Sequence, residues 1–82
     1  MKKKELLLFI KKILFSKRII KKNIKTKELL NFNIFENEKI DSLVLMTIIT
    51  ELESVSKKNI NLGYFKIKKN QTVEKIINKI NK

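Results

Sequence analysis

The apolar residues between positions 42 and 56 recur every three or four residues, and this spacing constrains the fold of the chain more than any other feature. The recurring side chains are Leu45, Ile48, Ile49, Leu52 and Val55. They share one face of an α-helix, whereas a strand would send alternate residues to opposite faces. Asp41 precedes the run, where an aspartate can accept hydrogen bonds from the free N–H groups of a first helical turn. Residues 42–56 are therefore expected to form an amphipathic helix with Asp41 as its N-cap.

Two other segments show the same period. Residues 4–15 place an apolar face opposite lysines, with Leu6, Leu7, Ile10, Ile13 and Leu14 on that face. Thr72 precedes a shorter run in which Val73, Ile76, Ile77 and Ile80 are spaced for a final helix. Both patterns predict helices that bury one face against a common core, with Thr72 as the cap of the last one.

The segments between these helices lack a clean period. Residues 16–39 scatter apolar side chains among lysines and asparagines, which predicts a long connection that packs some of them onto the core. A short helical turn is expected near Thr26–Leu30, with Thr26 as its cap, and residues 60–71 are expected to form a loop or short turn around Gly63. The predicted fold is one all-α domain over residues 1–82. It is a small bundle of three main helices plus a short helical turn, with a long loop between the first and second main helices.

The residue types that the chain lacks exclude several kinds of chemistry. It contains no cysteine, no histidine, no proline and one glycine. The missing cysteine excludes disulfides and thiolate nucleophiles, and the missing histidine removes the commonest general base. A phosphate-binding loop that needs several glycines is excluded as well. The chain is therefore not expected to be an enzyme.

The first residues resemble a targeting signal only briefly. Lysines precede Leu6–Ile10, but this apolar stretch is five residues long and Lys11 and Lys12 interrupt it. A membrane-spanning helix needs roughly 20 apolar residues, and no small-residue cleavage site follows. A cytoplasmic location is the expectation.

The charge is strongly positive, but it is unevenly distributed. The chain carries a net charge of +12, while residues 40–56 contain three acidic residues and no basic one. A basic surface favours nucleic acid or an anionic membrane as a partner, and a composition bias towards lysine would produce the same charge. Sequence-specific binding of nucleic acid is not expected, because Arg18 is the sole arginine and no helix concentrates base-reading side chains. Transient contact with an anionic membrane remains an alternative, because the first helix places lysine beside leucine and phenylalanine.

Ser42 is the candidate for chemical modification. It follows Asp41 at the start of the expected helix, where N–H groups and the helix dipole favour an incoming phosphate. No histidine is present to activate its hydroxyl, so its reactivity would have to be supplied by another protein. We therefore expect Ser42 to be modified by a separate enzyme.

These residues together resemble the acyl carrier protein family over nearly the whole chain. The sequence IDSLVLMTIITELE, residues 40–53, is similar to the second helix of these carriers, and Ile60 stands where the family has an isoleucine. QTVEKIINKIN, residues 71–81, is similar to their last helix, and residues 4–15 resemble their first. The resemblance implies that a phosphopantetheinyl transferase attaches 4′-phosphopantetheine from coenzyme A to Ser42, flanked by Asp41 and Leu43. A monomer would then hold acyl or aminoacyl groups as thioesters for loading and transfer enzymes.

The expected docking surface departs from the family pattern. Acyl carrier proteins are usually acidic, and their second helix meets basic patches on partner enzymes. Here Val44, Thr47 and Ser54 occupy positions that are often acidic, while Glu51 and Glu53 keep their negative charge. The expected docking residues are therefore largely apolar, namely Leu43, Val44, Met46, Thr47 and Glu53. The resemblance implies a specialised carrier for a lipid, polyketide or aminoacyl pathway, and the alternative is a small basic protein that binds nucleic acid or an anionic membrane surface.

Overall fold

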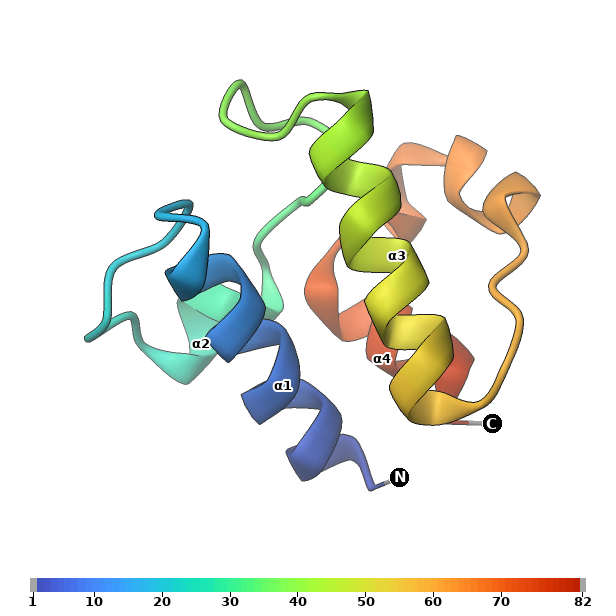
Figure 1. Cartoon of the computed structure of the whole chain (residues 1–82), viewed down its shortest axis with the longest axis horizontal. Coiled ribbons are helices and arrows are strands. Elements are labelled where there is room, and N and C mark those ends of the chain that lie inside the picture. The colour runs from blue at the N-terminus through green and yellow to red at the C-terminus, as the bar shows by residue number, and fades with distance from the viewer. Residues whose placement is uncertain (1, 82) are drawn as a thin grey trace.

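The three helices expected from the apolar periodicity form, and a shorter fourth helix lies between the first two (Figure 1). The structure is a computed structural model that describes residues 2–81. Its α-helices are α1 (Lys3–Ser16), α2 (Thr26–Leu30), α3 (Ser42–Ser56) and α4 (Val73–Ile80). Two short 3₁₀ helices, η1 (Leu62–Lys66) and η2 (Lys68–Asn70), precede α4. The prediction of an all-α fold with three main helices, a short helical turn and a long first connection is confirmed.

Local hydrogen bonds explain where the helices begin. The Val44 N–H donates to the Asp41 carboxylate at 2.8 Å, and the Lys75 N–H donates to the Thr72 hydroxyl at 3.4 Å. These bonds satisfy N–H groups that have no partner inside the first turn. The caps predicted for α3 and α4 are therefore confirmed. The prediction of Thr26 as a cap is wrong, because Thr26 is already the first residue of α2 and Lys25 precedes it without a side-chain bond.

The core lies between the apolar faces of α1, α3 and α4. In Figure 1, α1 and α3 run in opposite directions, and α4 lies behind α3 and packs against α1 and α2. Every buried side chain among residues 2–81 is apolar. The helices contribute most of them: Leu6, Ile10, Ile13 and Leu14 from α1, Leu29 from α2, Ile48, Ile49 and Leu52 from α3, and Val73, Ile76, Ile77 and Ile80 from α4.

The long connection between α1 and α3 closes part of this core, as its scattered apolar residues predicted. Its buried side chains are Ile19, Ile20, Ile34 and Ile40, in addition to Leu29 of α2. The segment therefore follows the surface of the core rather than projecting from it. This packing fixes the path of the chain towards the start of α3.

The end of α1 turns the chain sharply and returns it to the core. Arg18 adopts a left-handed conformation with φ of 60°. Its N–H donates to the Phe15 carbonyl at 3.0 Å, and the Ile19 N–H donates to the Leu14 carbonyl at 2.9 Å. This pair of bonds is the Schellman motif, in which a left-handed residue, usually glycine, ends a helix. Ile19 and Leu14 are both buried, which supplies the hydrophobic contact that accompanies the motif.

The segment before α4 is more ordered than the expected loop around Gly63. Within η1, the Phe65 ring is buried, stacks on Phe35 with ring centroids 5.3 Å apart, and meets the edge of Tyr64 at 5.0 Å. These aromatic contacts anchor the segment to the connection that precedes α3. Among residues 2–81, no helix has both the length and the apolar character needed to cross a bilayer.

Candidate functional site

The start of α3 presents an exposed hydroxyl group on an ordered helical turn. Ser42 is the first residue of α3 and is exposed to solvent. No residue among 2–81 forms a hydrogen bond with its side chain. Asp41, immediately before it, accepts the Val44 N–H through its carboxylate and the Leu45 N–H through its carbonyl at 2.9 Å. The hydroxyl is thus free to react, while the backbone that carries it is held by two bonds.

The first two N–H groups of α3 are available to an anion. The Asp41 carboxylate accepts the hydrogen bond of the Val44 N–H, but the N–H groups of Ser42 and Leu43 have no partner among the described residues. Free N–H groups and the positive end of the helix dipole favour a phosphate at such a position. The residues present at Ser42 are therefore compatible with a phosphate ester on its hydroxyl.

The solvent-facing side of α3 carries exposed apolar side chains beside Ser42. Leu43 is 76% exposed and Met46 is 45% exposed. Together with Thr47, Thr50 and Glu51 they line a shallow depression of about 250 Å³. Their positions are separated by three, four, seven and eight residues from Leu43, so they lie on one face of the helix. We call these five residues the outer face of α3.

Three of the five residues predicted for partner docking belong to this outer face, namely Leu43, Met46 and Thr47. Val44 is half-buried and packs against the core instead. Glu53 is also half-buried, and its carboxylate accepts the Ile60 N–H at 2.8 Å. Val44 and Glu53 therefore lie outside the outer face of α3, and the docking role predicted for them stays a prediction.

Thr50 and Glu51 were missed as members of the outer face. Helical spacing alone identifies them, because Thr50 follows Leu43 by two turns and Glu51 follows Thr47 by one turn. The predicted set ends at Thr47 on this face, and Thr50 and Glu51 lie one helical turn beyond it. Glu51 gives this otherwise uncharged surface one carboxylate.

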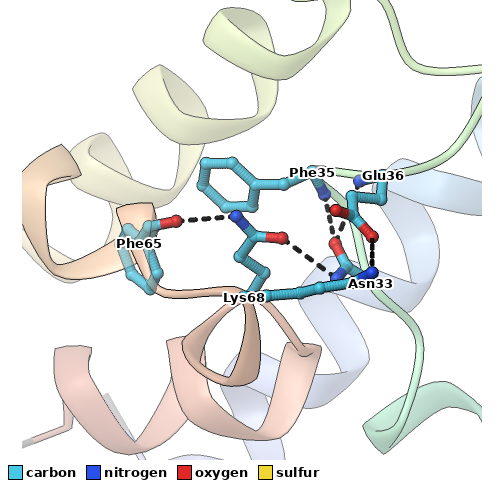
Figure 2. A network of polar contacts seen from close by, with 6 residues as sticks. Asn33, Phe35, Glu36, Phe65 and Lys68 are labelled. Carbon is cyan, nitrogen blue, oxygen red and sulfur yellow. Dashed lines mark hydrogen bonds and ion pairs between the residues drawn. The ribbon is translucent and has the colours of Figure 1, made fainter.

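A network of polar side chains holds the connection that leads into α3 (Figure 2). The Asn33 side-chain oxygen accepts the N–H groups of Phe35 and Glu36 at 2.8 and 3.0 Å, and its amide nitrogen donates to Gln71 Oε1 at 3.1 Å. Gln71 in turn donates through Nε2 to the Phe65 carbonyl at 2.7 Å. The network joins two segments that are separated by 38 positions in the sequence.

Further contacts on either side of the network join the same two stretches of chain, residues 32–36 and residues 68–73. An ion pair joins Lys68 and Glu36 at 3.1 Å, with both side chains largely exposed. The Val73 N–H donates to the Phe32 carbonyl at 2.9 Å, and Asn33 pairs with Thr72 in an isolated antiparallel bridge. The bonds to Asn33 are the important ones energetically, since an exposed ion pair contributes at most about 1 kcal/mol. Through them the segment just before α4 holds residues 33–36 of the connection that leads to Asp41 and Ser42.

Comparisons of this chain with protein-family models, with curated proteins and with solved structures find no significant match.

Proposed function

We propose that this chain is a carrier protein whose Ser42 hydroxyl is the attachment point of a 4′-phosphopantetheine arm. The observation that carries the proposal is the exposed and unbonded Ser42 side chain, fixed on the first residue of α3 between the capping Asp41 and the exposed Leu43. The all-α fold, with a long connection before α3, is consistent with the order of helices in acyl carrier proteins.

The chain itself would supply position rather than catalysis. A phosphopantetheinyl transferase would remove the Ser42 proton and join its oxygen to the phosphorus of the phosphopantetheine half of coenzyme A, releasing adenosine 3′,5′-bisphosphate. The N–H groups of Ser42 and Leu43 lie where they can face the resulting phosphodiester. When attached, the arm supplies a terminal thiol that holds an acyl or aminoacyl group as a thioester. Tethering raises the local concentration of that group at the active site of a partner enzyme.

The outer face of α3 would be the surface that loading and transfer enzymes recognise. It lies beside Ser42 and contains the most exposed large apolar side chain of residues 2–81, Leu43. Acyl carrier proteins usually present carboxylates in this region, whereas here Glu51 is the single acidic member. The proposed partners would therefore contact this face mainly through apolar groups.

Intact-protein mass spectrometry tests the proposal. The purified chain would be incubated with coenzyme A and a broad-specificity phosphopantetheinyl transferase, with an established carrier loaded in parallel. We expect wild type to gain the mass of one phosphopantetheine and Ser42→Ala to gain none. Ser54→Ala is the matched control, because Ser54 is another exposed serine of α3, and it should be modified like wild type. An unmodified wild type beside a fully loaded control carrier would contradict the proposal.

A further inference from the structure

The side of α1 that faces away from the core carries two exposed apolar side chains. Leu8 is 58% exposed and Phe15 is 45% exposed, although α1 buries four other apolar residues in the core. Lys11 and Lys12 lie between them in the sequence. Each lysine is three or four residues, about one helical turn, from both Leu8 and Phe15. This side of the helix is therefore both apolar and basic.

The connection after α1 adds a third lysine to the same surface. Leu8, Lys11, Lys12, Phe15 and Lys22 together line a shallow depression of about 300 Å³. Lys22 reaches it because the left-handed turn at Arg18 reverses the chain after α1. We call these five residues the α1 patch. Its surroundings are also basic, since residues 17–25 contain five basic side chains and no acidic one.

An anionic lipid surface matches both properties of this patch. Entry of leucine and phenylalanine side chains into the boundary between headgroups and acyl chains stabilises the bound state. Electrostatic attraction between lysines and lipid phosphates stabilises it further. Long lysine side chains can extend their ammonium groups to the headgroups while the helix lies flat. The patch is shallow and open, which suits a planar surface and offers no deep cleft for a peptide side chain.

Nucleic acid matches the patch less well. Lysines would contact the phosphate backbone, but Leu8 gains nothing there and would be placed against a hydrated, charged surface. Proteins that bind single strands use several aromatic side chains on which successive bases stack, and the patch has one, Phe15. The two exposed apolar side chains therefore favour lipid over nucleic acid.

We infer that the α1 patch is a peripheral binding site for anionic lipid bilayers, with Leu8 and Phe15 entering the interface and Lys11, Lys12 and Lys22 contacting lipid phosphates. The site is separate from Ser42 and goes beyond the carrier function. A carrier held at a bilayer in this way would have its cargo delivered at the membrane surface. Binding is reversible, because it rests on two apolar side chains and on charges that salt screens.

Vesicle sedimentation measures the binding and its dependence on the patch. The full chain should bind vesicles of equal parts phosphatidylcholine and phosphatidylglycerol, and should not sediment with phosphatidylcholine alone. Removing the charges in Lys11→Gln/Lys12→Gln/Lys22→Gln should weaken binding on the order of 100-fold, at about fivefold for each lysine near the surface. The control Lys66→Gln/Lys69→Gln/Lys75→Gln removes the same charge from η1, η2 and α4, and its effect should be several times smaller.

The apolar contribution has its own matched control. Leu8→Ser/Phe15→Ser should weaken binding about tenfold or more, because both side chains lose their burial in the interface. Leu62→Ser/Ile67→Ser removes two side chains of similar exposure, 41% and 54%, at η1 and just after it. The orange segment that contains η1 lies across α3 from α1 in Figure 1, so this variant should bind like wild type. Ser42→Ala should also bind like wild type, which separates this test from that of the carrier function.

Fluorescence of an introduced tryptophan reports insertion directly, because the wild-type chain contains no tryptophan of its own. Phe15→Trp should shift its emission to shorter wavelength when anionic vesicles are added, whereas Ile67→Trp should show no shift. Circular dichroism of each variant checks that the fold is retained. The inference is overturned if Phe15→Trp shows no shift, or if both lysine triple variants lose binding equally. It is also overturned if an oligonucleotide binds through the patch lysines, independently of Leu8 and Phe15, and anionic vesicles do not bind.

Discussion

Glu53 near the end of α3 accepts a hydrogen bond from the backbone N–H of Ile60, seven residues later, at 2.8 Å. Between the two residues the chain leaves α3 through Lys57, which adopts a left-handed conformation with φ of 58°. Ile60 is buried in the core. The carboxylate thus ties the chain that leaves α3 to the helix end, and Glu53 serves the fold rather than the outer face of α3.

Removing this carboxylate should destabilise the protein. Glu53→Ala leaves the Ile60 N–H without its charged acceptor, so the free energy of unfolding should fall by about 1–2 kcal/mol. Urea denaturation followed by circular dichroism measures the change. Glu51→Ala removes the same charge from the same helix without breaking a described bond, and it should cost clearly less. Equal losses in the two variants would show that the bond contributes nothing.

The polar network around Asn33 should be important for the order of the connection before α3. Asn33→Ala removes the acceptor of two backbone N–H groups and the donor to Gln71, so we expect a loss of about 2 kcal/mol of stability. The amides of Phe35 and Glu36 should also exchange faster with deuterium, as measured by NMR. Asn31→Ala is the control, because Asn31 is exposed and its side chain forms no bond with residues 2–81. Unchanged exchange at Phe35 and Glu36 would contradict the role of Asn33.

The left-handed turn at Arg18 should be a place where glycine stabilises the protein. Glycine adopts φ of 60° without the steric cost that a Cβ atom adds, so Arg18→Gly should raise the free energy of unfolding by about 0.5–1 kcal/mol. Thermal and urea denaturation measure the gain. Arg18→Ala removes the same charge but keeps the Cβ atom, and it should not stabilise. A gain of the same size from alanine would assign the effect to charge rather than to backbone conformation.

The composition of the outer face of α3 should determine which enzymes accept the loaded carrier, a prediction that rests on the proposed function. Thr47→Glu/Thr50→Glu adds carboxylates beside Glu51, where they can meet basic patches on enzymes adapted to acidic carriers. We expect a KM several-fold lower with a generic ketosynthase, and little change in kcat. Val44 is a poor site for this test, because it packs against the core and a charge there would cost stability.

A control pair separates the local effect from the change in net charge. Asn31→Glu/Asn59→Glu adds the same two charges at exposed positions outside the outer face. This variant should leave the KM for the generic ketosynthase close to that of wild type. If both pairs lower the KM equally, the recognition depends on net charge and not on the outer face.

The sequence by itself determined the three main helices and the position of Ser42. The apolar spacing of residues 42–56, with Asp41 before it, is local information, and α3 begins and ends where that pattern predicts. The same holds for Thr72 and α4. Residues three and four apart must share a helical face, so the exposure of Ser42 and Leu43 follows once the core face is known.

Tertiary structure alone decided which side chains from distant segments meet beside these helices. Local spacing contains no information that Asn33 meets Gln71, that Lys22 joins Leu8 and Phe15, or that Glu53 bonds to the Ile60 N–H. Lys22 follows the left-handed turn at Arg18, and Ile60 follows the one at Lys57. Neither turn residue is the glycine that usually marks a left-handed conformation. Helices are encoded by neighbouring residues, whereas the surfaces they share are set by packing between segments distant in the chain.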